Sequence, residues 1–171
     1  MGSLGYFTRS DRGVIQRAAF LAEGLTQRYF NLAEGVWKRN PYGIYTFKEA
    51  NESLCDPDAF ANVIRFTSRS GHPGRHGRGD RYGIVLHDPN ILLALLRSVC
   101  PDLWTMGLLV LTHELTHIVR FTEYGVNFFA SEEDRDKEEH TVHSMTREML
   151  SGVTNADYVL DLYESQRISI Q

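Results

Sequence analysis

The chain has few cysteines, and the two that it has lie far apart. Cys55 and Cys100 lack the paired spacing of a zinc knuckle, so we expect two reduced and buried thiols, with a disulfide as the alternative. A chain of 171 residues can bury a hydrophobic core without a disulfide or a structural metal. We therefore expect residues 1–171 to form a single domain.

Long apolar runs are also missing. No stretch of the chain approaches the length of a membrane span. The first residues contain no apolar segment long enough for a signal peptide. These absences predict a cytoplasmic protein that does not enter a membrane.

A strong excess of charge of one sign is lacking as well. The formal net charge is -4, which argues against a chain-wide electrostatic role on nucleic acid or membranes. Residues 65–81 are a local exception, because they are rich in arginine and glycine and poor in apolar side chains. We predict a mobile loop there, which could bind a nucleic acid or an acidic partner, although a solvated loop is the simpler interpretation.

One short run carries most of the chemical information in the chain. The sequence Val-Leu-Thr-His-Glu-Leu-Thr-His-Ile-Val occupies residues 110–119. Residues four apart lie one turn above each other on a helix, so His113 and His117 can direct their imidazoles at one cation, with Glu114 beside them. The flanking residues of the run are all uncharged, as a helix buried away from bulk water requires. The pattern predicts metal-dependent hydrolysis, and an ordinary buried helix with two histidines is the alternative.

The motif and its uncharged flanks resemble the active-site helix of the zincin metallopeptidases. The resemblance implies one Zn²⁺ per chain, held by His113 and His117. It also implies that Glu114 is the general base, which takes a proton from a metal-bound water during peptide-bond hydrolysis. The oxyanion would need a donor from outside the motif, and Tyr124 or His143 is the nearest candidate along the chain.

A catalytic zinc ion usually has three protein ligands, so the two histidines need a third partner. The metzincin pattern would require glycine and histidine where this chain has Arg120 and Glu123, which excludes that subclass. What remains resembles a gluzincin, in which a glutamate about twenty residues past the second histidine, on the next helix, completes the site. Glu138 and Glu139 both lie at that distance.

We favour Glu139 as the third ligand over its neighbour. Glu139 shares a helical face with His143, whereas Glu138 leads into the apolar stripe of the same helix. Many gluzincins have an aspartate one turn after the ligand glutamate, where this chain has His143. His143 and His140 therefore remain alternative ligands, or neighbours that support the site.

The pattern of apolar residues, caps and prolines predicts an α+β fold, mostly helical, with a small sheet, an active-site helix and a following third-ligand helix. The zincin resemblance implies a strand upstream of the active-site helix that lines the cleft and pairs with an extended substrate, and residues 82–87 are the best-placed candidate. The expected helices are 10–41, 57–64, 89–96, 102–124, 132–151 and 156–165, and the expected strands are 42–47 and 82–87.

The expected function is that of a zinc-dependent endopeptidase with a peptide or protein substrate. The alternative is a zincin-fold regulatory or DNA-associated module with little or no general peptidase activity, which the arginine-rich segment motivates. Metal analysis tests the zinc site, and salt-dependent DNA binding tests the alternative.

Overall fold

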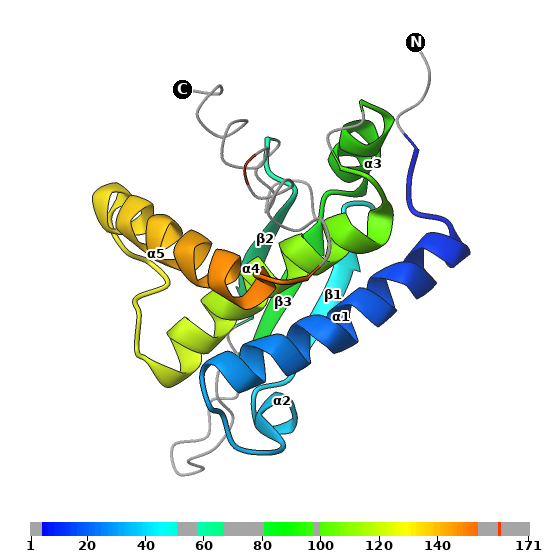
Figure 1. Ribbon diagram of the computed structural model, residues 1–171. Coiled ribbons are helices and arrows are strands. Elements are labelled where there is room, and N and C mark those ends of the chain that lie inside the picture. The colour runs from blue at the N-terminus through cyan, green and yellow to red at the C-terminus, as the bar shows by residue number, and fades with distance from the viewer. Residues whose placement is uncertain (1–4, 51–57, 67–80, 98–99, 154–160, 162–171) are drawn as a thin grey trace, which may run out of the picture.

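The computed structural model describes residues 5–50, 58–66, 81–97, 100–153 and 161. This part of the chain has the predicted mostly helical α+β architecture, with a small mixed sheet (Figure 1). Its elements, in chain order, are α1 (Arg9–Tyr29), α2 (Val36–Arg39), β1 (Tyr42–Thr46), β2 (Ala61–Phe66), β3 (Arg81–Leu86), α3 (Asp88–Leu96), α4 (Leu103–Glu123) and α5 (Glu132–Leu150).

The first helix is shorter than the sequence predicts. α1 ends at Tyr29, and the expected single helix towards Pro41 is wrong. Asn31 and Gly35 follow with φ angles of 50° and 74°, which a right-handed helix cannot contain. The chain therefore turns between Tyr29 and Val36, and the short helix α2 begins after Gly35.

Residues 61–66 form a strand, although the sequence predicts a helix that runs from Asp56-Pro57 to Ile64. β2 pairs antiparallel with β3, with Val63 opposite Ile84. The prediction is wrong for this part because β-branched Val63 and Ile64 suit a pleated surface, and pairing with β3 overrides a local helix signal. Residues 51–57 lie outside the described residues.

The strand order is β1-β3-β2, with β1 parallel to β3. The predicted strand at 82–87 is confirmed as β3, but its expected role beside a substrate is wrong. β3 is central and its backbone pairs with strands on both sides, so an extended peptide cannot pair with it. β2, not β3, lies at an edge of the described sheet. The strand order depends on pairing between segments that are distant in sequence.

The core is built around α4, which Figure 1 shows near the middle of the molecule. α4 packs against α1, α3, α5, β2 and β3, and residues 105–119 are all buried. A helix that is covered on every side is expected to be mostly apolar, and most of this run is apolar. At its crossing with α1, a Cβ on Gly107 would meet the Ile15 side chain at 2.8 Å, so the missing side chain allows the close approach.

Both ends of α4 and the start of α5 carry local cap signals. Asp102 accepts a hydrogen bond from the backbone N–H of Thr105, and Gly125 follows the helix with a φ of 65°. Ser131 caps α5 in the same way through Asp134. Local signals in the sequence therefore set where α4 ends and where α5 begins.

Some predictions concern residues that the structure does not describe. The helix expected at 156–165 falls outside the described residues except for residue 161, and so do Cys55 and most of the arginine-rich segment. Cys100 is buried, and its burial raises the pKa of the thiol to about 11. Of the described helices, none is both long and apolar enough to cross a membrane.

Candidate metal centre

Three potential metal ligands converge where α4 and α5 meet. Nε2 of His113 and Nε2 of His117 lie 3.2 Å apart. Oε2 of Glu139 lies 3.3 Å from His113 Nε2, and Oε1 of Glu139 lies 3.2 Å from His117 Nε2. Ligand atoms about 2.1 Å from one zinc ion, at tetrahedral angles, are separated by about 3.4 Å. The donors of these residues therefore have the spacing that a tetrahedral ion requires.

The convergence follows from the helical register of both elements. His113 and His117 are one turn apart on α4, and their rings meet edge to face with centroids 4.9 Å apart. Phe121, one further turn along, stacks on the ring of His117 at 5.8 Å and restricts its rotation. α5 then brings Glu139 to the same point from the opposite side.

Burial makes these charges strongly interdependent. His113 is 2% exposed and His117 is 7% exposed. Burial lowers the pKa of His117, but the hydrogen bond and charge of Glu139, with the charges of Glu114 and Glu138, outweigh burial and raise the pKa overall. Burial likewise raises the pKa of Glu139, yet its contacts with the two histidines hold that pKa well below its usual range. The site thus favours a proton on His117 beside the ionised carboxylate of Glu139.

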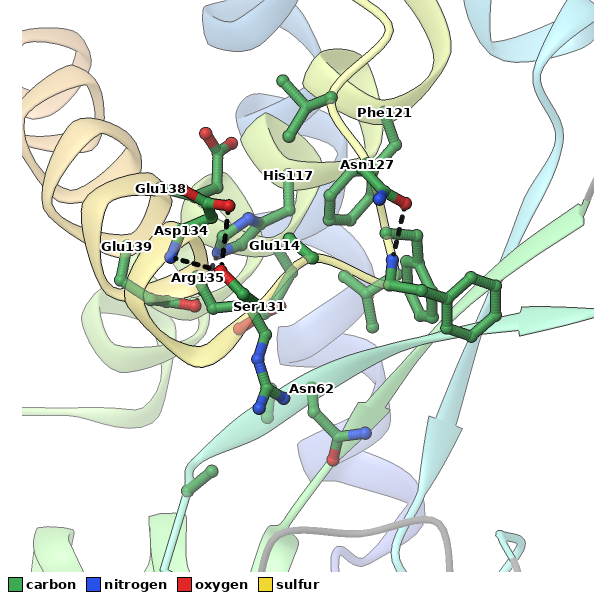
Figure 2. A pocket seen from close by; sticks show the side chains of 17 residues that line it. Asn62, Glu114, His117, Phe121, Asn127, Ser131, Asp134, Arg135, Glu138 and Glu139 are labelled. Atoms are coloured by element: carbon green, nitrogen blue, oxygen red, sulfur yellow. Dashed lines mark hydrogen bonds and ion pairs between the residues drawn. The ribbon is translucent and has the colours of Figure 1, made fainter.

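Glu114 faces the same pocket as two of the three converging residues. It is 5% exposed and lines a cavity of about 830 Å³ together with His117 and Glu139 (Figure 2). The group of three potential ligands found among the described residues does not include Glu114. Glu114 therefore lies beside the candidate metal centre, and its role as the base stays a prediction.

Glu138 has a different partner from its neighbour. Arg120 Nε lies 2.5 Å from Oε1 of Glu138, and Arg120 Nη2 lies 2.8 Å from Oε2. This bidentate ion pair links α4 to α5, so the carboxylate of Glu138 is paired with Arg120. A guanidinium and a carboxylate form such a pair with good geometry because both groups are planar.

The other predicted site residues differ in how close they lie to the candidate metal centre. The His143 ring is 6.0 Å from the ring of His113, so it is a neighbour of the centre, as expected. His140 is exposed, and its Nδ1 lies 3.1 Å from the backbone oxygen of Asp136, so the structure does not bring it to the site. Tyr124 caps α4, packs against Phe30 and does not line the pocket. It is therefore poorly placed for an oxyanion donor, because α4 ends before the chain reaches the cavity again.

Sequence reasoning missed several residues that shape the pocket. β2 and the connection at 126–130 form one wall, and Arg135 of α5 points into the cavity (Figure 2). Helical spacing was an available signal, since Phe121 follows His117 by four residues and Arg135 precedes Glu139 by four. The wall contributed by β2 had no such signal, because it depends on the strand order.

Comparisons with known proteins found no match for this chain among family models, curated proteins or solved structures. Function must therefore be inferred from the chemistry of the residues themselves. Two histidines and a glutamate are a recurring ligand set of catalytic zinc, which keeps a fourth position open for water or substrate. In this chain two of the three potential ligands, His117 and Glu139, line a large cavity.

Proposed function

We propose that the protein is a zinc-dependent metallopeptidase of the gluzincin type, which binds one Zn²⁺ per chain through His113, His117 and Glu139. The observation that carries this proposal is the convergence of their donor atoms at 3.2–3.3 Å beside a cavity of about 830 Å³. A structural zinc site would usually be closed by a fourth protein ligand. Three ligands next to an open cavity favour a catalytic site.

The residues of this chain divide the work of hydrolysis between them. Zinc bound here would polarise a carbonyl group and lower the pKa of water. Glu114 accepts a proton from the attacking water and returns it to the leaving amine, because its carboxylate faces the same cavity as His117. Phe121 holds the His117 ring in place by stacking. The buried run of α4 keeps bulk water away from the back of the site.

The substrate we propose is a peptide or protein that lies in the cavity between β2 and α5. Ala61, Asn62 and Val63 of β2 line this cavity, and β2 is an edge strand of the described sheet. An edge strand offers unpaired backbone groups with which an extended peptide can form hydrogen bonds. We therefore propose that β2 pairs with the substrate, in place of β3, for which the sequence predicts this role.

The decisive experiment separates metal binding from proton transfer. Elemental analysis of the purified wild-type protein should give about one zinc per chain, and the His113→Ala and His117→Ala variants should lose it. Glu114→Gln should keep the zinc and lose roughly a hundred- to ten-thousandfold in the rate of cleavage of a peptide library. The matched control is Glu123→Gln at the far end of α4, where the carboxylate accepts a hydrogen bond from Asn40.

Two outcomes would refute this assignment. Stoichiometric zinc in both histidine variants would place the metal elsewhere in the chain. Loss of zinc from the Glu114→Gln variant, as complete as in the histidine variants, would make Glu114 a ligand and exclude it as the base.

The alternative function is a regulatory or DNA-associated module, located in the cytoplasm like the proposed peptidase. Its basis is the arginine-rich segment 65–81, of which residues 67–80 lie outside the described residues. It stays a prediction. Binding of a DNA duplex, measured at several salt concentrations, tests it, because affinity that depends on phosphate contacts falls steeply with salt.

A further inference from the structure

We propose that Arg135 forms an anion subsite beside the candidate metal centre, and that this subsite selects substrates with a carboxylate close to the scissile bond. The inference deepens the proposed function and rests on it. It gives the substrate a chemical property, a negative charge at a defined place, which the three converging residues alone do not supply.

Arg135 is placed to contact a substrate. It precedes Glu139 by four residues on α5, so the two side chains share a helical face and start about 6 Å apart along the axis. Both residues line the cavity that also contains Glu114 and His117. Figure 2 shows the guanidinium of Arg135 reaching away from α5 towards β2 and Asn62.

The charges around the cavity leave Arg135 without a protein anion. Apart from His117, the other titratable side chains that line the described part of the cavity are carboxylates, and most of them have partners. Glu138 pairs with Arg120, Asp134 accepts a hydrogen bond from the Ser131 hydroxyl, and Glu139 faces the two histidines. Within the described part of the chain, the guanidinium of Arg135 makes no hydrogen bond or ion pair.

An arginine in this position calls for an anionic partner of a particular shape. The guanidinium is planar and permanently charged, and it binds a carboxylate through two parallel hydrogen bonds. Arg120 shows that pattern with Glu138 at the same helix pair. Arg135 has the same chemistry, but it is exposed and lines the cavity, so we assign its carboxylate partner to a ligand.

A second positive group lies near the rim of the same cavity. The guanidinium carbon of Arg65, on β2, is 5.5 Å from the ring centroid of Phe129. Phe129 lines the cavity and is 71% exposed. Arg65 does not itself line the cavity, so the anion subsite is assigned to Arg135 alone.

The shared cavity limits where the carboxylate can be. Arg135 and Glu139 line the same cavity, and residues of an extended peptide are spaced only about 3.3 Å apart, so the group that reaches Arg135 belongs to a residue close to the scissile bond. The carboxylate of an acidic side chain meets this condition, and so does the free carboxylate at the C-terminus of a peptide. Both sources present the same chemistry to Arg135.

Binding of matched hydroxamate probes distinguishes these sources without requiring catalysis. Each probe has a hydroxamate that coordinates zinc, followed by glutamate amide, glutamine amide or glutamine with a free C-terminus. Their affinities for the zinc-loaded protein are measured by calorimetry. We expect one carboxylate probe to bind about ten- to a hundredfold more tightly than the neutral glutamine amide, as a charge-assisted hydrogen bond predicts. The tighter of the two acidic probes identifies the source.

Variants assign the preference to Arg135. Arg135→Gln should remove the advantage of the acidic probe and leave the affinity of the neutral probe unchanged, which also shows that the variant is folded. Arg135→Lys should retain part of the advantage. The control is Arg147→Gln on the same helix, whose guanidinium pairs with Asp161 away from the cavity.

The possible failures are distinct. Equal affinity for all three probes, or an acidic preference that survives in Arg135→Gln, overturns the anion subsite even if the protein cleaves peptides. A preference that depends on Arg135 in a protein that cleaves no peptide overturns the peptidase proposal and leaves the subsite standing. A protein that takes up no zinc overturns both, because the subsite is defined by the cavity that it shares with the zinc ligands.

Discussion

Two adjacent glutamates show how strongly the direction of a single side chain decides its chemistry. Glu138 and Glu139 differ by one step of α5, a rotation of about 100°. Because of that rotation, Glu138 forms an ion pair with Arg120, whereas Glu139 points at His113 and His117. The carboxylates are chemically identical, so the helix orientation alone separates an ion pair from a candidate ligand.

At this scale we predict a ranking of zinc affinities. Glu139→Ala should weaken zinc binding by more than about a hundredfold, because it removes a direct ligand. His143→Ala should weaken it by no more than about ten- to a hundredfold, as expected for a neighbour of the ligands. His140→Ala is the matched control on the same helix, since His140 is exposed and turned away. Competition with a chelator of known affinity measures all three.

A different ranking would change the interpretation of the site. If His143→Ala proved the most damaging and Glu139→Ala bound zinc normally, the centre would have three histidine ligands. The gluzincin proposal would then fail, although His113 and His117 would keep their roles.

At the scale of the elements, the pairing of α4 with α5 decides whether a site exists. The two histidines belong to α4 and the glutamate to α5, so the ligand set depends on how the helices are held together. The Arg120–Glu138 ion pair joins them next to the site, with side-chain exposures of only 16% and 13%. Arg120 follows His117 by three residues and Glu138 precedes Glu139 by one, so the pair fixes both helices where the ligands meet.

We predict that breaking this pair damages stability and zinc affinity together. Arg120→Gln leaves Glu138 without its cation in a largely buried position, which should cost at least about 2 kcal/mol of unfolding free energy. Zinc affinity should fall by about ten- to a hundredfold, because α5 no longer holds Glu139 in place. Urea unfolding of the zinc-free protein and chelator competition measure the two effects.

The double variant Arg120→Gln/Glu138→Gln provides the test of mechanism. It should recover much of the lost stability, since no charge is left unpaired. Glu49→Gln is the control, because its ion pair with Arg12 is well exposed and should contribute much less. An additive double variant would mean that the two residues do not act as a pair.

At the scale of the whole molecule, the candidate centre connects the core to its surface. α4 holds the two histidines within the most buried part of the chain, whereas α5 is buried on one side only. A metal ion between them would join a stable element to a more exposed one. The fold should nevertheless form without metal, because the core has its own extensive apolar packing.

We therefore expect zinc to raise the melting temperature without being required for folding. At a free zinc concentration about 100 times the dissociation constant, binding stabilises the folded state by about 2.7 kcal/mol. For a chain of this size that corresponds to a shift of roughly 5–10 °C. Calorimetric scans with zinc and with chelator measure the shift, and the doubly substituted His113→Ala/His117→Ala protein is the control. An equal shift in that control would place the stabilising metal at another site.

The sequence alone determined the parts of the site that depend on neighbours along one helix. The spacing of His113, Glu114 and His117 puts them on one buried stretch, and Asp102 and Gly125 mark the ends of that helix. Ser131 marks the start of the next helix in the same way. Helical register and end caps are local interactions, which is why they could be predicted from the residues. The preference for Glu139 over Glu138 also came from register, and the structure directs Glu139 at the two histidines.

Only the tertiary structure decided which elements surround the site. The place of β2 along the cavity, the central position of β3 and the pairing of Arg120 with Glu138 all join segments distant in sequence. Strand order depends on which apolar faces can be buried together, and burial is a property of the assembled core. The position of Arg135 has the same origin. Its helical face could be predicted, but the wall that its guanidinium faces exists only because β2 packs beside α4.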